Sequence, residues 1–469
     1  MAIEGKGVIA RVMPRIKAPP EWGIEPVPRE HRLLGFLDYF VLWADLGVGL
    51  LVLLAGTLLV PGLGLGQALV AIVIGTLIGN LLLALAGVVG SDNAIPTMVM
   101  LRPALGIRGS YLPTALNVLQ LLGWTIFEII IMGYGANEIS KRVLGLDSYI
   151  FWAAVFALVV ILMGIGGPVA VVRQWLEKFA VWMVLITTLW LTFHILTTYD
   201  VAALLRQPGK GGLPFWVAVD IVIAMPVSWL PLVADYNRFA RHTGRGFWGT
   251  YLGYLVTNIW FYGLGALVLL AAAVTQEPKG FVAAIALTAG LPALLIFLVD
   301  ETDNAWADLY SAAVSVQNVF PRVRQRWLII GLGVFSFLVA AVLDITQYET
   351  FLLLIGSVFV PIFGVLAADY FVLRQRRYQV DELYRPNGAY WYRTGMNIPG
   401  VLAWLLGVLA YQVANPGFLS TYLPTWGQWI PSQLTQWGGS LPAFVVAFGT
   451  CWVLGQIIAR EPHPVSEAK

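Results

Sequence analysis

The chain has 469 residues, of which 59% are hydrophobic and 12% are charged, and its mean hydropathy is +0.78. A soluble domain carries roughly twice that charged fraction, so the composition excludes an ordinary soluble protein and predicts an all-α polytopic membrane protein. The net charge of +2 gives no reason to expect a nucleic-acid partner, and the single cysteine, Cys451, excludes an internal disulfide.

Apolar stretches recur along the whole chain and predict about twelve transmembrane helices. Residues 1–33 are polar and show no apolar core of a cleavable signal peptide. The spans are expected at about 34–60, 65–90, 112–137, 149–167, 172–198, 214–235, 248–274, 291–318, 327–343, 350–373, 396–414 and 439–458, with an amphipathic piece at about 278–289. This division predicts a ten-helix core at 34–373, a cytoplasmic loop at 374–395, two accessory helices at 396–458 and a cytoplasmic tail at 459–469.

The basic residues of the loops predict the orientation. With the N-terminus inside, 23 of the 28 Lys and Arg residues fall on the inner side. The five on the outer side are Lys141, Arg142, Arg206, Lys210 and Lys279. Inner loops of membrane proteins are enriched in Lys and Arg, so both termini are expected in the cytoplasm of a plasma (inner) membrane protein.

Two spans contain places where a helix can break. Span one has Gly47 and Gly49 beside Asp45, and span six has the run Met225 to Pro231 with two prolines. The spans are five apart, so the second half of the core (about 214–373) would be inverted relative to the first (about 34–198). Inverted repeats with broken helices are typical of alternating-access transporters, whereas ordinary kinks are the alternative.

Acids fall at membrane depth without a Lys or Arg at comparable depth. Each such acid costs about 2.5–3.5 kcal/mol on insertion scales and needs a reason. They are Asp45, Glu128, Asp220, Asp300, Glu301, Asp303 and Asp308. Some must be protonated, face water, or be matched by an entering cation, which could be sodium, a proton or a cationic substrate.

The densest group of acids lies in span eight. Asp300, Asn304 and Asp308 fall on one helical stripe, whereas Thr302 and Asp303 point elsewhere. A hydroxyl and a carboxylate side by side are hard oxygen ligands that suit an alkali cation. The alternative is that Asp300 and Glu301 sit near the outer surface and are merely solvated.

Span three contains an aromatic residue and an acid four positions apart. Trp124 and Glu128 therefore share one side of a helix. A flat ring and a carboxyl group on one face could hold a flat, nitrogen-bearing ring. The alternatives are helix packing for Trp124 and a structural hydrogen bond for Glu128.

Several motifs, taken in chain order, resemble one transporter family. They are Leu101 to Ser110, the pair Gly123-Trp124, the segment Val233 to Arg241, Thr302-Asp303-Asn304 with Asp308, and Ala367 to Phe371 followed by Arg374, Arg376, Arg377 and Tyr378. Together they resemble nucleobase–cation symport family 1 (the purine/cytosine permease family), whose members include cytosine, hydantoin, allantoin and uracil permeases. The span-three sequence is most similar to the hydroxymethylpyrimidine/cytosine branch.

The resemblance implies a LeuT-type fold of two inverted five-helix repeats plus two C-terminal helices, with substrate held between spans one, three, six and eight. It implies that Trp124 stacks on the substrate, and it aligns Glu128 with a glutamine and Asp308 with an asparagine that hydrogen-bond the ring. It aligns Thr302 and Asp303 with two hydroxyl ligands of sodium. The acid at Asp303 makes a proton credible as the coupling ion. Backbone ligands for the cation are expected at Ala44, Gly47 and Val299.

Other residues have less specific roles. Trp229 is the candidate for a second stacking aromatic, and Ser228 for a substrate hydrogen bond. Gln120 and Asn117 continue the face of Trp124 and line an inner vestibule or bond neighbouring helices. Asp45 contacts substrate or cation, or caps the break. Asp235 and Arg238 are expected to be gating or structural ion-pair residues.

These observations predict a cation-coupled secondary transporter, not an enzyme, without a cofactor beyond Na+ or H+. The expected substrate is an aminopyrimidine such as hydroxymethylpyrimidine or cytosine, because a carboxylate accepts from an exocyclic amine and a protonated ring nitrogen. The first alternative is a neutral ring such as uracil, a purine, allantoin or hydantoin. More remote alternatives are a membrane enzyme acting on a lipid head group and an amino-acid transporter of the same fold.

Overall fold

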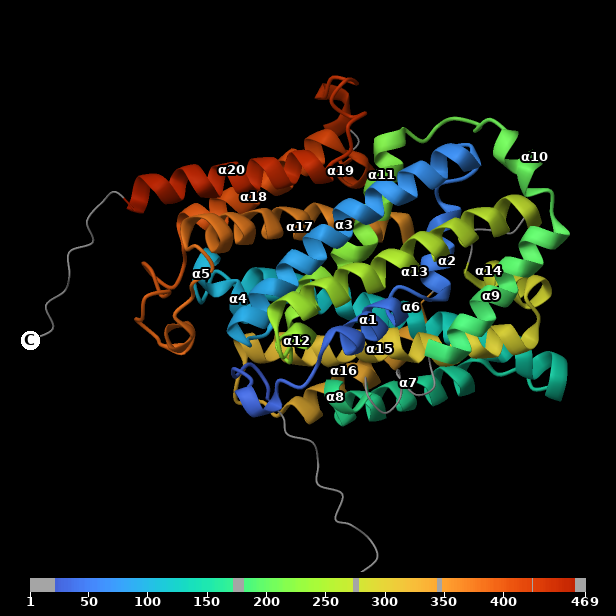
Figure 1. The fold of residues 1–469 in the computed structure, drawn as a ribbon, viewed down its shortest axis with the longest axis horizontal. Coiled ribbons are helices and arrows are strands. Elements are labelled where there is room, and N and C mark those ends of the chain that lie inside the picture. Colours follow the sequence, from blue (N-terminus) through green and yellow to red (C-terminus); the bar gives the residue numbers. More distant parts are fainter. Residues whose placement is uncertain (1–21, 172–180, 273–277, 344–347, 424, 460–469) are drawn as a thin grey trace, which may run out of the picture.

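The computed structural model describes residues 22–171, 181–272, 278–343, 348–423 and 425–459 (Figure 1). Within these ranges every regular element is a helix, and the extended pairings are isolated bridges between Leu34 and Ala240 and between Arg393 and Met396. The predicted all-α class is confirmed. Most of the expected N-terminal segment, and nearly all of the expected tail, lie outside the described residues.

Each predicted span corresponds to a helix or to a helix interrupted along its length. In chain order these are α1 (Phe36–Asp45) with α2 (Leu50–Thr57), α3 (Leu65–Asn93), α6 (Tyr111–Leu144), α7 (Tyr149–Gly166), α9 (Val181–Thr198), α11 (Phe215–Ser228) with α12 (Val233–Asn237), α13 (Thr243–Ala272), α15 (Leu291–Val319), α16 (Gln325–Ala340), α17 (Tyr348–Ala367), α18 (Ile398–Ala414) and α20 (Ser440–Ala459).

Shorter helices connect these spans. They are η2 (Arg29–His31), α4 (Thr97–Met100), α5 (Arg102–Leu105), α8 (Pro168–Val171), α10 (Val201–Arg206), η4 (Leu230–Leu232), α14 (Pro278–Thr288), η5 (Ala368–Leu373), η6 (Val380–Tyr384), α19 (Gly417–Tyr422) and η7 (Trp426–Trp429). The separate helix α14 matches the amphipathic piece expected between spans seven and eight. Among the boundaries that can be compared, the largest difference is in α6, which continues to Leu144 rather than ending near residue 137. The expected start of span five, at about 172, lies outside the described residues.

In the described part of the chain, seven helical segments are long and apolar enough to cross a membrane, and the bent pair α1–α2 makes an eighth. The apolar helices α16 and α18 are shorter, with 16 and 17 residues. Helix α15 has 29 residues and is not among the seven. The acids and amides of α15 make it less apolar than the other spans. Acids at membrane depth also suggest a functional role.

The first span is broken at the predicted place. Helix α1 ends at Asp45, α2 begins at Leu50, and their axes differ by 58°. Gly49, the residue before α2, has φ = +151°. A residue with a side chain rarely adopts this conformation, so the glycine makes the break possible.

The sixth span is interrupted at the predicted place, but it is not bent as sharply as the first. Helix α11 ends at Ser228, and the turn η4 leads into α12, but residues 215–237 together pass as one span. Pro226 lies inside α11 and Pro231 inside η4. The prolines remove backbone donors and loosen the helix without turning the chain through a large angle.

The interrupted spans lie in the interior of the bundle. Of the most apolar stretch of span six, 94% is buried, against 22% for α7 and for α20. Helix α6 packs along α15, α1 along α13, and α11 along α3. In Figure 1, α17, α18 and α20 lie on one side of the molecule and α7 and α16 on the other. The outer helices α7 and α20 therefore expose most of their apolar surface, whereas the polar spans meet inside the bundle.

Candidate functional site

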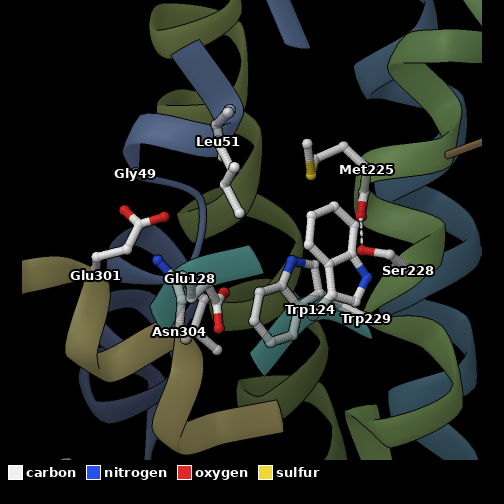
Figure 2. Close-up of a pocket in the computed structure, with 11 residues that line it drawn as sticks. Gly49, Leu51, Trp124, Glu128, Met225, Ser228, Trp229, Glu301 and Asn304 are labelled. Atoms are coloured by element: carbon white, nitrogen blue, oxygen red, sulfur yellow. Dashed lines mark hydrogen bonds between the residues drawn. The ribbon is translucent and has the colours of Figure 1, made fainter. Parts of the chain in front are cut away.

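A narrow cavity lies where the two interrupted spans face α6 and α15. The space free of atoms there is about 280 Å³, open solvent included. Its lining residues come from the first span, α6, the sixth span and α15 (Figure 2). They are Leu46, Gly49, Leu51, Val52, Trp124, Glu128, Met225, Ser228, Trp229, Glu301 and Asn304.

Two indoles line this cavity, those of Trp124 and Trp229 (Figure 2). Trp124 is held by edge contacts with Tyr348 and Phe351, with ring centroids 5.9 and 5.2 Å away. Trp229 donates its indole N–H to the Tyr254 hydroxyl at 2.9 Å. Because neighbouring rings and a hydrogen bond hold these indoles, they can present preformed apolar surfaces to a flat ligand.

Several polar groups that line the cavity are partly unsatisfied. Glu128 is 3% exposed, and its Oε2 atom has no hydrogen-bond partner among the described residues. Glu301 Oε2 accepts from the Leu50 backbone N–H at 2.9 Å. Asn304 donates to the Val48 carbonyl at 3.0 Å, and its Oδ1 atom has no partner in the described chain. Buried polar atoms are normally paired, so these acceptors suggest a ligand that brings donors.

A second group of acids lies beside the cavity. Asp45, Asp300 and Asp303 are buried and can each place a carboxylate oxygen within 4.8 Å of the others. Three hard oxygen groups this close could hold one cation or share protons.

The structure distributes the span-eight acids differently from the predicted stripe. Asp300 and Asp303 share the face that meets Asp45, whereas Glu301 and Asn304 share the face that lines the cavity. The alternative of surface solvation is wrong for Asp300 and Glu301, which are 2% and 1% exposed. In the sequence, Asp300 and Asp303 are three residues apart, as are Glu301 and Asn304. Residues three apart share one face of a helix, so this spacing could have indicated the two pairs.

The remaining cation candidates lie near this cluster with their own contacts. Thr302 donates its hydroxyl to the Val299 carbonyl at 2.6 Å, a bond within α15. A methyl group added at Gly47 would overlap Thr257 of α13, so this glycine permits close helix packing. Ala44 is buried one residue before Asp45. Each of these residues therefore has a packing or hydrogen-bonding role in the fold. Their role as cation ligands stays a prediction.

Three predicted substrate residues, Gln120, Asp45 and Asp308, lie outside the cavity lining, and a fourth, Ser228, lines it with its hydroxyl already bonded. Gln120 donates to the Ser228 carbonyl at 2.9 Å and to Asn117 at 3.1 Å, so it holds the interrupted part of span six. Ser228 lines the cavity, but its hydroxyl donates to the Met225 carbonyl at 2.6 Å. Asp45 and Asp308 are each 2% exposed and are not among the lining residues.

Asp235 and Arg238, the candidate gating or structural residues, make hydrogen bonds to neighbouring segments. Asp235 accepts from the Thr97 backbone N–H at 2.9 Å. Arg238 donates to the Gly23 carbonyl at 2.6 Å and to the Tyr310 hydroxyl at 3.1 Å. Arg238 therefore joins the segment before span one to α15, because its guanidinium spreads several donors over neutral acceptors.

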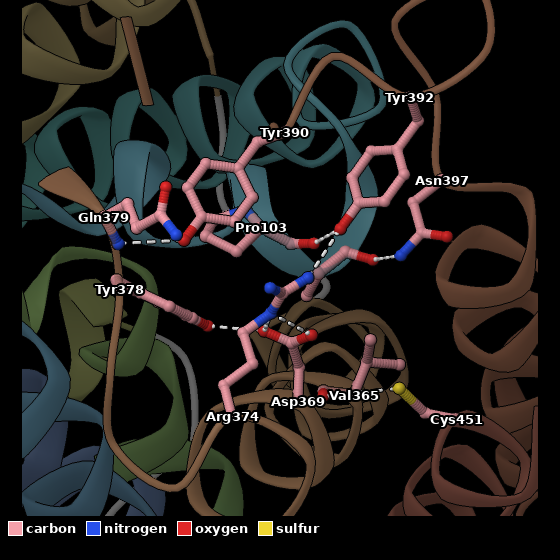
Figure 3. A network of polar contacts seen from close by, with 11 residues as sticks. Pro103, Val365, Asp369, Arg374, Tyr378, Gln379, Tyr390, Tyr392, Asn397 and Cys451 are labelled. Carbon is pink, nitrogen blue, oxygen red and sulfur yellow. Dashed lines mark hydrogen bonds and ion pairs between the residues drawn. The ribbon is translucent and has the colours of Figure 1, made fainter. Parts of the chain in front are cut away.

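A second polar network closes the same end of the bundle (Figure 3). Arg374 pairs with Asp369 at 2.9 Å and donates to the Tyr392 hydroxyl at 2.7 Å. Tyr392 in turn donates to the Pro103 carbonyl at 2.6 Å. Burial first, and then the neighbouring Asp369 carboxylate, raises the pKa of Tyr378 well above its usual value, so Tyr378 remains a donor to Asp369.

The arrangement of a central cavity between interrupted helices is shared with known transporters. The family described as "Permease for cytosine/purines, uracil, thiamine, allantoin" matches residues 26–453. The chain belongs to this permease family. It is therefore a membrane transporter and not an enzyme, as the sequence predicted.

Curated relatives place the chain among permeases of nitrogen heterocycles. It is 25% identical to the hydantoin permease of Microbacterium maritypicum, over 79% of this chain and 80% of that protein. It is 26% identical to the allantoin permease of Bacillus subtilis strain 168, with 79% and 82% covered. The cytosine permease of Escherichia coli strain K12 is 24% identical, with 76% and 85% covered.

Solved structures establish the LeuT-type fold. Mhp1, a nucleobase-cation-symport-1 family transporter in a closed conformation with bromovinylhydantoin bound, superposes with a TM-score of 0.78 at 21% identity, covering 95% of this chain and 96% of that one. Its inward-facing conformation gives 0.74 at 20% identity, with 96% of each chain covered. The predicted fold is confirmed.

Proposed function

We propose that this permease imports a single-ring, amino-substituted heterocycle of the aminopyrimidine type, such as hydroxymethylpyrimidine or cytosine, together with a cation. One observation supports it most: Glu128 Oε2 is buried without a partner in a cavity that Trp124 also lines. The two residues are one turn apart on α6, so a ring resting against the indole brings its polar edge to the carboxyl group.

The chemistry of Glu128 distinguishes this proposal from a neutral-ring carrier. An aminopyrimidine presents an exocyclic NH₂ beside a ring nitrogen, and a carboxylate can accept from both when the ring is protonated. A hydrogen bond with an ionised partner is roughly twice as strong as a neutral one. Uracil, allantoin and hydantoin present an amide edge instead, which leaves a carboxylate with fewer donors.

The coupling cation is proposed to occupy the cluster of Asp45, Asp300 and Asp303. Their carboxyl groups lie close together and are buried. Three negative charges in a low-dielectric interior repel one another strongly, so an entering cation or protons would relieve that repulsion. The acid at position 303 favours a proton, or sodium binding linked to a proton, over sodium binding alone.

We propose that both termini lie in the cytoplasm and that the protein lies in the plasma (inner) membrane. The excess of Lys and Arg in alternate loops supports this orientation. The hydrogen bonds of Arg238 and the pair of Arg374 with Asp369 then lie at the cytoplasmic end. Substrate leaving toward the cytoplasm would require these contacts to open.

Uptake of labelled ligands by cells expressing the protein tests the proposal. We expect accumulation of cytosine or hydroxymethylpyrimidine above accumulation of uracil and allantoin, and loss of accumulation when the driving gradient is removed. Sodium replacement and dissipation of the proton gradient, applied separately, identify the coupling ion. Equal or better accumulation of uracil or allantoin would favour the neutral-ring alternative, and no accumulation of any of them would reject the proposal.

A further inference from the structure

The second half of the broken first span begins at the cavity. The first N–H groups of a helix lack partners within the helix and, with the helix dipole, form a site that attracts anions. In transporters with broken helices, such ends point at anionic groups of substrates. In this chain the end of α2 is already occupied, because the Leu50 N–H donates to Glu301 Oε2 at 2.9 Å.

The local backbone is built for this contact. A Cβ atom added at Gly49 would lie 2.9 Å from Glu301 Oε2 and 3.2 Å from Asn304 Nδ2, and Gly49 also has a positive φ. One turn along α15, Asn304 donates to the Val48 carbonyl at 3.0 Å. Helix α15 therefore contacts both sides of the break, with Glu301 on the donor side and Asn304 on the acceptor side.

The cavity around this contact is rich in acceptors. Its described lining includes Glu128 and Glu301 but no Lys, Arg or His. Two buried acceptors, Glu128 Oε2 and Asn304 Oδ1, have no partner among the described residues, and the indole N–H of Trp124 is one unpaired donor. A ligand that brings several N–H donors matches this set, whereas a ligand that brings a carboxylate meets two carboxyl groups and one donor.

We infer that Glu301 sets the charge selectivity of the cavity: its carboxylate fills the helix end that would otherwise attract a substrate anion, so neutral and cationic rings are accepted and anionic rings are rejected. The inference rests on the proposed function, since it concerns the same cavity. It adds a specificity-determining residue on α15.

A matched set of ligands tests the inference. Cytosine, 5-hydroxymethylcytosine and 5-carboxycytosine share one ring and one amine, and the last two differ in charge at similar size. Binding to the purified full-length protein is measured by ligand-induced thermal stabilisation over a range of concentrations. The variants are Glu301→Gln, which keeps an acceptor for Leu50, and Glu301→Asp, which keeps the charge. Glu138→Gln is the control, because Glu138 pairs with Arg142 near the end of α6, away from the cavity lining.

In the unmodified protein we expect 5-carboxycytosine to bind at least about 30-fold more weakly than 5-hydroxymethylcytosine. Glu301→Gln should narrow that ratio by about tenfold, whereas Glu301→Asp and Glu138→Gln should keep it. An unchanged ratio in Glu301→Gln, with cytosine still bound, would overturn the inference. So would loss of all three ligands by a folded Glu301→Gln protein, which would make Glu301 a direct ligand contact. If the unmodified protein binds none of the three, the proposed function fails together with the inference.

Discussion

Asp220 on α11 accepts a hydrogen bond from the backbone N–H of Ser440 at 3.1 Å, and also one from Gly439. The carboxyl group thus caps the start of α20 from a helix more than 200 positions earlier in the chain. One of the seven intramembrane acids therefore has a structural role. It fastens the accessory helix α20 to the core.

Replacing Asp220 with Ala should lower the thermal stability of the purified protein. The change leaves the N–H groups at the start of α20 without their buried partner, at a cost of about 1–3 kcal/mol. The measurement is the unfolding temperature in detergent. Asp200→Ala is a control, because Asp200 caps the exposed helix α10 through Ala203 and its loss should cost about 0.5–1 kcal/mol. An equal effect of the two changes would contradict the role given to Asp220.

Replacing Glu128 with Gln should weaken aminopyrimidine binding about tenfold, since a charge-assisted hydrogen bond becomes a neutral one. Binding of uracil should weaken less or improve, because an amide side chain can pair with an amide edge. Competition against labelled cytosine gives both affinities. Glu138→Gln on the same helix controls for the loss of an acid, and unchanged cytosine affinity in Glu128→Gln would assign Glu128 a structural role.

Replacing Trp124 with Ala should lower ring affinity about 5- to 150-fold, which corresponds to the loss of about 1–3 kcal/mol of stacking. Trp124→Phe should recover part of that loss because an aromatic face remains. Trp182→Ala is the matched control, since Trp182 is 59% exposed on α9. Binding curves for the three variants separate the loss of stacking from general destabilisation. If Trp124→Ala binds the ring as tightly as Trp182→Ala, Trp124 does not contact the substrate.

Replacing Asp45 or Asp303 with Asn should uncouple transport from its cation. We expect concentrative uptake to fall about 5- to 150-fold, the range of typical coupling energies, while substrate binding without a gradient persists. The measurement compares uptake into proteoliposomes with proton and sodium gradients applied in turn. Asp147→Asn is the control, because Asp147 pairs with Lys141 on the exposed surface. Gradient-driven uptake that survives both changes would place the coupling site elsewhere.

Replacing Gly49 with Ala should weaken ligand binding and stability together. The new methyl group would meet Glu301 and Asn304, and the positive φ of this position is unfavourable for alanine. Gly66→Ala is the matched control, since nothing lies within 4 Å of the added atom at that position of α3. Thermal unfolding with and without cytosine measures both effects. A Gly49→Ala protein as stable as Gly66→Ala would show that the break tolerates a side chain.

Much of the fold was predictable because the bilayer imposes simple rules. A helix must cross about 30 Å of hydrocarbon, so long apolar stretches of the sequence marked every span that the structure describes. The glycines near Asp45 marked the break of the first span for a different reason. Glycine readily adopts positive φ, which is a local property of the backbone. The prolines likewise marked the interruption of span six, but they did not indicate its bend. The angle of such a bend depends on the neighbouring helices.

The candidate site was predictable in part. Trp124 and Glu128 were recognised because they lie one turn apart on one helix and differ from their apolar surroundings. Glu301 and Asn304 were not assigned to the substrate cavity, and the partners of Asp235 and Arg238 were not specified. Each of these depends on which face of a helix meets which neighbour.

The sequence by itself determined that this is a helical membrane transporter, because hydropathy, loop charge and motif order are properties of the chain read along its length. Only the tertiary structure decided how the acids of α15 divide between Asp45 and the cavity, and that Glu301 occupies the end of α2. The physical reason is that a helix presents every direction around its axis. A side chain's partner is chosen by the rotation and approach of the packed helices, which no local pattern specifies.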